Sequence, residues 1–188
     1  MIKHIMLDLE TLGKTSNAVM LSIGAAHFNL YTKEIYSTFE RQIHPQSSID
    51  AGCEVDGDTI YWWMNQDREA QKQMQKDPTS LGQALYEFRQ WFDKIGSEDT
   101  YIWCTAPDFD MPILRNAYLR LRQQPPFKYN CVRDVRTMRS LARETYEYYR
   151  DHPERSGIDH TSLADCLFQI EYLCDIATQL KQQNFEIS

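Results

Sequence analysis

The chain has 188 residues and a mass of 22.2 kDa, a length that suits one domain with a sizeable core. Hydrophobic residues make up 42% and charged residues 25%, which excludes an intrinsically disordered chain. No apolar run approaches the roughly 20 residues that span a bilayer, and the N-terminus lacks the apolar core of a signal peptide. We therefore expect a single domain over residues 1–188, no membrane partner and a cytoplasmic location.

The charge and the cysteines narrow the classes further. The formal net charge of -7 counts against extensive phosphate contacts, unless several of the acids hold metal cations. The five cysteines include no Cys-x-x-Cys pair, and an odd number in a chain without an export signal predicts reduced thiols. Structural zinc is not expected, and nothing in the sequence sets the oligomeric state.

The first half of the chain predicts strands followed by helices. Apolar and alternating runs predict three strands that form an antiparallel meander, over residues 2–9, 18–28 and 34–44. Ser, Asp, Gly and Pro are frequent in residues 45–57, which we expect to form a surface loop. Two helices should follow, over residues 59–66 with Asp58 as the cap and over residues 81–96 with Thr79 or Ser80 as the cap.

The second half alternates between strands and helices. Residues 101–106 and 127–134 predict two further strands, and residues 108–122 between them predict a helix. A helix to about Tyr149 and a long last helix over residues 160–183 complete the chain. This order predicts an α/β fold in which helices flank a mixed five-stranded sheet.

The stretch IMLDLETLG, residues 5–13, ends an apolar run in two acids one residue apart. Alternate side chains of a strand face the same side, so Asp8 and Glu10 should project together. Two adjacent carboxylates disfavour each other's charge unless a cation lies between them. Because such pairs also arise by chance, this pair needs support from elsewhere in the chain.

Two later clusters supply that support. In PDFDMPIL, Asp110 falls at the start of a helix; an acid there can be a plain helix cap, a role that suits Asp108 better. In HTSLADC, His160 lies at the entry of the last helix and Asp165 about one turn inside it. The plain alternative is a surface histidine and a solvated acid, but apolar neighbours make Asp165 awkward as an unpaired carboxylate.

Asp8, Glu10, Asp110 and Asp165 together supply four carboxylates, a donor set that suits Mg²⁺ or Mn²⁺ rather than zinc. Two such cations roughly 3.5 to 4 Å apart would offset the repulsion, activate a water and stabilise the leaving oxygen of a phosphoryl displacement. An imidazole titrates near neutral pH, so His160 could accept the proton of that water.

The order LDLET, WCTAPDFDMPIL and HTSLADC resembles the three motifs of the DEDDh branch of the DnaQ-like, ribonuclease H-like 3′-to-5′ exonucleases. The histidine five residues before the last aspartate is typical of this branch. DTIYWWMNQDREAQ and VRDVRTM are similar to segments of its phage exonuclease A and mycobacterial exoribonuclease-like subgroup. The likeness implies a ribonuclease H-like fold and a single exonuclease domain. Asp108 stands before the Phe-Asp pair, where the family often has a small or amide residue.

The resemblance also implies a role for each of the five residues. Asp8 would bridge two metal ions, and Glu10 and Asp165 would hold the ion that carries the nucleophilic water. Asp110 would hold the second ion, and His160 would be the general base. The implied cofactors are two Mg²⁺ or Mn²⁺ ions in each active site.

Substrate contacts follow from the same resemblance. The backbone of Thr11 and Leu12 would meet the terminal nucleotide at the 3′ end of a single strand. Trp62, Trp63 and Phe109 are candidates for stacking on bases, although one of the two tryptophans is equally suited to the core. Which tryptophan stacks is left open by the sequence.

Two arginines complete the expected substrate site. Arg133 and Arg136 in VRDVRT could contact phosphates, and we expect one of them rather than both to do so. The alternative is internal pairing with the neighbouring Asp134.

Taken together, the residues and the resemblance predict a metal-dependent 3′-to-5′ exonuclease. It would release nucleoside 5′-monophosphates from single-stranded DNA 3′ ends by two-metal-ion hydrolysis. A 3′-to-5′ exoribonuclease with the same site is the first alternative, and a non-catalytic nucleic-acid-binding module is the second. The complete set of acids argues against the module. The resemblance also suggests a phage or prophage protein that recycles nucleotides or trims ends in the host cytoplasm.

Overall fold

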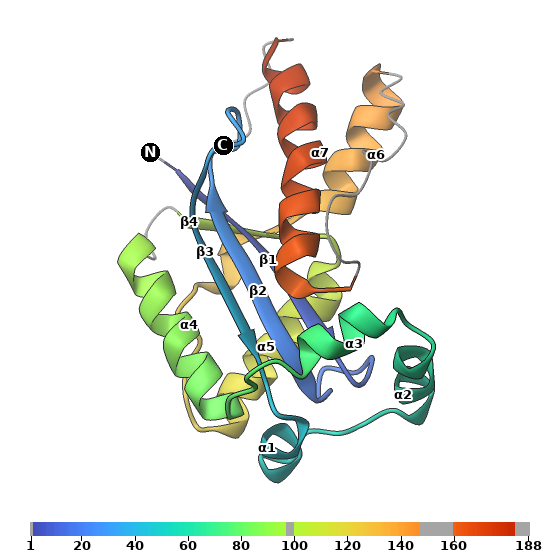
Figure 1. The fold of residues 1–188 in the computed structure, drawn as a ribbon. Coiled ribbons are helices and arrows are strands. Elements are labelled where there is room, and N and C mark those ends of the chain that lie inside the picture. Colours follow the sequence, from blue (N-terminus) through green and yellow to red (C-terminus); the bar gives the residue numbers. More distant parts are fainter. Residues whose placement is uncertain (1, 97–99, 147–159, 183–188) are drawn as a thin grey trace.

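The computed structural model describes residues 2–96, 100–146 and 160–182 (Figure 1). Five strands form one mixed sheet in the order β3-β2-β1-β4-β5. β1 pairs antiparallel with β2 and parallel with β4, and β3 and β5 form the edges. The strands are β1 (Lys3–Thr11), β2 (Met20–Phe28), β3 (Ile35–Gln42), β4 (Thr100–Cys104) and β5 (Val132–Asp134). The predicted mixed five-stranded sheet is confirmed.

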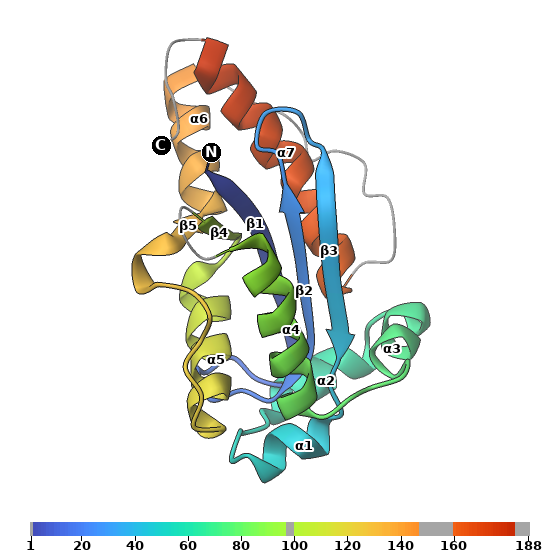
Figure 2. The ribbon, with the colours of Figure 1, turned by 90° about the vertical axis from the view of Figure 1, so that its left-hand side faces the viewer.

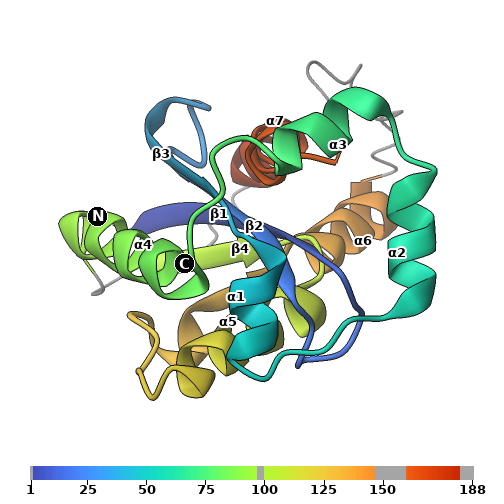
Figure 3. The same cartoon turned by 60° about the horizontal axis from the view of Figure 1, so that its bottom comes forward.

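Helices cover both faces of this sheet (Figure 2). One face is covered by α4 (Leu81–Ile95) and α5 (Pro107–Arg120), and the other by α6 (Val135–Tyr146) and α7 (Ser162–Gln182). Three short helices gather at the end of the sheet where β1 and β3 end: α1 (Pro45–Asp50), α2 (Gly57–Met64) and α3 (Arg68–Met74) (Figure 3). No helix among the described residues is long and apolar enough to cross a membrane.

The alternation along β1 divides the core in two. Ile5, Leu7 and Leu9 pack into the core under α4 and α5, whereas Met6 packs into the core under α7. The period of two therefore puts the next even positions, 8 and 10, on the α7 side. The strand also extends further than the predicted residues 2–9, because its pairing with β2 continues to Thr11. Both acids thus belong to the strand itself.

The loop expected over residues 45–57 is confirmed for residues 51–56 and is wrong for Pro45–Asp50, which forms the helix α1. Pro45 occupies the first turn of α1, where its fixed φ suits a helix and its missing N–H costs nothing. The His44 side chain caps this helix by accepting a hydrogen bond from the backbone N–H of Gln46 at 3.3 Å. The polar composition of the segment gives no helical pattern of apolar residues, and α1 is instead stabilised by Pro45 and the His44 cap in its first turn.

The prediction that Asp58 caps the next helix is also wrong. Asp56 is the cap, and its carboxylate accepts hydrogen bonds from the backbone N–H groups of Asp58 and Thr59 at 2.7 and 3.2 Å. The helix α2 therefore starts at Gly57, two residues before the predicted start. The following helix α3 was not predicted, because its sequence REAQKQM has few apolar residues.

The remaining elements agree with prediction, apart from their ends. Ser80 caps α4, as one of the two predicted alternatives. The strand expected over residues 127–134 is shorter, because Tyr129–Cys131 forms a 3-10 helix before β5. The helix expected to reach Tyr149 is described only to Tyr146, and the rest lies outside the described residues. All five cysteines are buried and free of disulfides, in agreement with reduced thiols.

A buried histidine in β1 makes stability depend on pH. His4 is 7% exposed, and its Nδ1 accepts a hydrogen bond from the indole N–H of Trp103 at 3.0 Å. Burial, followed by the charges of His27 and Arg133, lowers the pKa of His4 from 6.5 to about 4. The unfolded chain therefore takes up a proton between pH 6.5 and 4 that the folded chain does not, so stability falls as the pH falls through this range.

We expect the free energy of unfolding to fall between pH 7.5 and pH 5 by on the order of 2 kcal/mol more in the natural protein than in His4→Gln. Glutamine does not titrate, and its carbonyl can replace the acceptor for Trp103. Urea unfolding at both pH values measures the difference. Equal pH dependence in the two proteins would contradict a buried neutral histidine.

Candidate active site

The start of α7 lies directly on β2, beside the two acids of β1. Gly24 pairs with Asp8 across the strands, and a Cβ on Gly24 would lie 2.2 Å from the carbonyl carbon of Ser162. Only glycine leaves room for the helix at this point. Ser22, which pairs with Glu10, donates its hydroxyl to the Ser162 hydroxyl at 3.0 Å. These contacts fix where α7 begins relative to β1.

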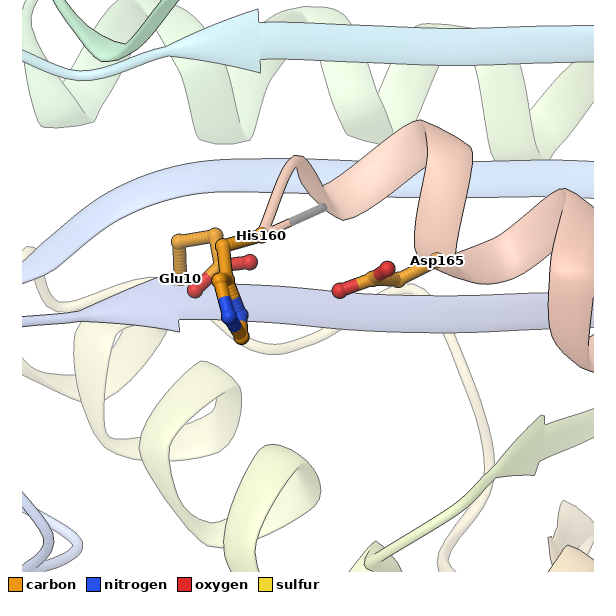
Figure 4. Close-up of side chains that lie close together, drawn as sticks. All are labelled: Glu10, His160 and Asp165. Carbon is orange, nitrogen blue, oxygen red and sulfur yellow. The ribbon is translucent and has the colours of Figure 1, made fainter. Parts of the chain in front are cut away.

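This packing brings three of the predicted residues together. Potential metal-ligand atoms of Glu10, His160 and Asp165 all lie within 4.8 Å of one another (Figure 4). Glu10 comes from β1, Asp165 comes from the first turn of α7, and His160 lies two residues before that helix. His160 has a φ of 62°, a left-handed conformation that is uncommon outside glycine and often marks a functional position. The predicted entry geometry of this helix is confirmed.

Asp8 borders this cluster and is held by a residue that the sequence did not indicate. The side-chain amide of Gln169 donates a hydrogen bond to Asp8 Oδ1 at 2.9 Å. Gln169 is 7% exposed and lies one turn after Asp165 on the same face of α7. The four-residue spacing from Asp165 to another polar residue in an apolar stretch is the signal that could have revealed it.

Asp110 reaches the same strand from the opposite side of the sheet. It lies in the first turn of α5, and only 4% of its surface is exposed. Burial raises the pKa of Asp110 to about 7, although a hydrogen bond from the backbone N–H of Leu9 and the charge of Arg136 lower it. Because Leu9 lies between Asp8 and Glu10, this contact places the Asp110 carboxylate next to the acids of β1.

The donor set fits a divalent cation. Glu10, Asp110 and Asp165 are 9%, 4% and 8% exposed, so three carboxylates are buried at one end of the sheet. Burying carboxylates is costly, and the raised pKa of Asp110 reflects that cost. A hard cation with oxygen ligands offsets the cost. Asp8, Glu10, Asp165 and Asp110 are the residues that would hold it, with His160 beside them.

A cavity of about 380 Å³ opens beside Glu10. Thr11, Trp62 and Phe109 are among its lining residues. Leu12 lines a separate, largely apolar cavity of about 500 Å³, and Trp63 lines both. Ligand sites commonly have volumes of roughly 300 to 1,000 Å³, and the cavity beside Glu10 falls within this range.

The two neighbouring tryptophans differ in their surroundings. Trp62 is 44% exposed, and its ring stands edge-on to the His160 ring with 4.9 Å between the centroids. Trp63 is 8% exposed, and its indole N–H donates to the backbone carbonyl of Thr11 at 2.9 Å. Trp62 therefore offers a free ring surface next to the cluster, whereas Trp63 fixes the backbone after β1.

The two arginines differ in the same way. The guanidinium of Arg133 lies 3.6 Å from the centre of the Tyr101 ring and donates to two nearby backbone carbonyls. Arg136 lies close enough to Asp110 to lower its pKa. Asp134 accepts hydrogen bonds from the backbone N–H of Arg136 and the hydroxyl of Thr137, so it caps α6. Of the two arginines, Arg136 is the one whose charge acts on the site.

Gln169→Met is expected to weaken Mn²⁺ binding by about 10- to 100-fold, because residues that orient a metal ligand typically contribute this much. Methionine keeps the volume and loses the donor to Asp8. Isothermal titration calorimetry measures the affinity. The control is Gln42→Met on β3, which makes the same exchange at another buried glutamine, 9% exposed. This variant should bind Mn²⁺ as tightly as the natural protein does. Equal affinities for both variants would exclude a role for Gln169 at the metal site.

The sequence model of the family described as "3'-5' exoribonuclease Rv2179c-like domain" matches residues 3–177. No curated protein matches the chain. The structure is similar to E. coli Exonuclease I in complex with a 5cy-dA13 oligonucleotide, with a TM-score of 0.69 and 13% identity over 97% of this chain and 41% of that one. It is also similar to the nuclease domain of 3′hExo, a DEDDh family member bound to rAMP, with a TM-score of 0.62 and 15% identity over 99% and 94% of the chains.

These likenesses confirm the ribonuclease H-like fold. The chain spans about two fifths of the length of Exonuclease I, and nearly all of the 3′hExo nuclease domain. The family match includes both acids of β1, the start of α5 and most of α7. The chain belongs to the family of Rv2179c-like 3′-5′ exoribonuclease domains.

Proposed function

We propose that the protein is a metal-dependent 3′-to-5′ exonuclease that releases nucleoside 5′-monophosphates from single-stranded RNA. The cluster of Glu10, His160 and Asp165, bordered by Asp8 and Asp110, is the observation that carries this proposal. When bound, two Mg²⁺ or Mn²⁺ ions supply an activated water and stabilise negative charge on the phosphate. The description of the family as exoribonucleases favours RNA.

The chain's own residues bind the strand end and handle the proton. His160 accepts the proton of the attacking water, and the edge-on contact with Trp62 restricts the position of its ring. The terminal nucleotide occupies the cavity beside Glu10, next to the backbone of Thr11. The exposed ring of Trp62 stacks on a base, a contact that contributes roughly 1 to 3 kcal/mol and suits any sequence.

Single-stranded DNA is a second candidate substrate. Several of the similar structures are of E. coli Exonuclease I in complex with oligodeoxynucleotides, among them dT13 and dA16. The sequence analysis also favoured DNA. Matched RNA and DNA oligomers of one sequence distinguish the two substrates.

The test is to incubate 5′-labelled oligomers with the protein and either Mg²⁺ or Mn²⁺. We expect progressive shortening from the 3′ end, release of mononucleotides, and no reaction in excess chelator. His160→Asn, which tolerates the left-handed backbone at this position, should lose the activity. His27→Gln on β2 should keep it. Internal fragments, or cleavage that a chelator does not stop, would contradict the proposed function.

A further inference from the structure

We propose that Thr59 reads the sugar of the terminal nucleotide by a hydrogen bond between its hydroxyl and the ribose 2′-hydroxyl. This inference rests on the proposed function and makes RNA, rather than DNA, the preferred substrate. Thr59 lies in the first turn of α2 and is one of the residues that line the same cavity as Glu10 and Thr11. No motif of the sequence analysis assigned it a role in the site.

The helix that carries Thr59 is fixed against the end of β1. The Asp56 carboxylate accepts from the backbone N–H of Thr59 at 3.2 Å, and the Asp56 N–H donates to the Leu12 carbonyl at 2.7 Å. One turn later, Trp63 donates to the Thr11 carbonyl at 2.9 Å. Hydrogen bonds at both ends of this turn thus hold Thr59 next to the backbone after Glu10.

The Thr59 hydroxyl is buried without a hydrogen-bond partner among the described residues. The residue as a whole is 8% exposed, and a buried polar group left unpaired costs about 1 to 3 kcal/mol. The other threonine of this cavity wall differs, because Thr11 already donates its hydroxyl to the Gly13 carbonyl at 2.7 Å. Thr59 is therefore the hydroxyl of this wall that lacks a partner among the described residues, and rotation about its Cα–Cβ bond would present it to a bound molecule.

The chemistry of a nucleotide indicates which of its groups pairs with the Thr59 hydroxyl. An exonuclease meets every base in turn, and because the base edges differ in their donors and acceptors, a contact to a base edge would not be available at every step. Phosphate oxygens only accept hydrogen bonds and belong with the cations. A sugar hydroxyl donates and accepts, as a threonine hydroxyl does, and it is present on every ribonucleotide.

The cavity offers two partners for the two neighbouring hydroxyls of a ribose. The buried carboxylate of Glu10 can only accept while ionised, and it can take one hydroxyl as a donor. The Thr59 hydroxyl is then left to pair with the second ribose hydroxyl. A 2′-deoxyribose lacks that second hydroxyl, so a DNA end would leave the Thr59 hydroxyl unpaired as it is in the free protein, whereas an RNA end would gain a hydrogen bond. The cavity therefore discriminates against DNA without any contact to a base.

The test compares oligomers that differ only in a terminal uridine, 2′-deoxyuridine or 3′-deoxyuridine. We expect kcat/KM in the natural protein to be about tenfold higher for the uridine end than for the 2′-deoxyuridine end, because the latter lacks one buried hydrogen bond. In Thr59→Val, which keeps the shape, this ratio should fall to about one. Thr59→Ser should retain it. The unfolding temperature of Thr59→Val should equal or exceed that of the natural protein, because no protein hydrogen bond is lost.

Calorimetry with uridine and 2′-deoxyuridine 5′-monophosphates in Mn²⁺ tests the contact without hydrolysis, and the natural protein should bind the ribonucleotide about tenfold more tightly. A preference that survives in Thr59→Val would overturn the proposal, as would equal treatment of the two sugars by the natural protein. A different outcome is that Thr59→Val abolishes the difference between uridine and 3′-deoxyuridine ends and leaves the difference between uridine and 2′-deoxyuridine ends unchanged. That result would assign the contact to the 3′-hydroxyl and overturn the proposed 2′-hydroxyl contact. Failure to hydrolyse any oligomer, with the binding preference intact, would overturn the proposed function alone.

Discussion

Asp165→Asn is expected to reduce hydrolysis of 3′ ends by about 10³-fold or more, because it removes a charged ligand from the group that we propose holds the catalytic ions. Asparagine has nearly the same size and keeps the backbone N–H bond to the Thr161 carbonyl at 2.9 Å. The helix should therefore stay in place. Rates measured with Mn²⁺, together with Mn²⁺ affinity by calorimetry, test the prediction, and both should fall.

Stability should respond in the opposite direction. Asp165 is 8% exposed and lies within 4.8 Å of Glu10 ligand atoms, so a neutral amide removes repulsion between buried carboxylates. The metal-free variant should unfold at the same temperature as the natural protein or higher. Asp175→Asn is the control on the same helix, where the carboxylate pairs with Lys33 at 2.8 Å and should not affect hydrolysis. Loss of activity through unfolding, visible as a lower unfolding temperature, would contradict the assigned role.

Gly24→Ala should damage the site without touching any of its functional groups. The new Cβ would lie 2.2 Å from Ser162, and backbone atoms at that distance must move. The displaced start of α7 carries His160 and Asp165 away from Glu10, and a misplacement of about 1 Å can reduce a rate 10²-fold. Overpacking of this kind also costs about 1 to 3 kcal/mol of stability. Urea unfolding and the exonuclease rate together measure both effects.

Gly82→Ala is the matched control, because a Cβ at this position in α4 meets only a side-chain atom of Leu121 at an ordinary 3.7 Å. Alanine is favoured over glycine inside a helix by up to about 1 kcal/mol, so this variant should be as stable as the natural protein or more so. It should keep full activity. Natural stability and rate in Gly24→Ala would contradict the close approach of α7 to β2.

The sequence was sufficient for the sheet and for the acids because both follow from strong local patterns. The alternation in β1 orients Asp8 and Glu10 to one side wherever the strand ends. His160 lies just before α7 and Asp165 lies in its first turn, so their spacing indicates where the helix begins. The short helices α1 and α3 are harder to predict, because Pro45 and Asp67 mark helix starts that are followed by few apolar residues.

Other parts of the site depend on contacts between distant segments. Gln169 meets Asp8 across 161 residues of sequence, and neither residue indicates the other. Thr59 becomes informative only when its surroundings show that its hydroxyl has no partner. The choice between Trp62 and Trp63 likewise depends on which ring faces Thr11 in the folded chain. These features are set by tertiary packing, which hydrophobic periodicity does not report.

The most direct test of the central claim is the position of Mn²⁺ in crystals grown with Mn²⁺ and uridine 5′-monophosphate, located by anomalous scattering. The structure predicts Mn²⁺ among Asp8, Glu10 and Asp165, and its loss from that position in Asp165→Asn. It also predicts the nucleotide sugar in the cavity lined by Thr59. Mn²⁺ bound elsewhere on the chain, with this cluster empty at saturating concentration, would contradict the account.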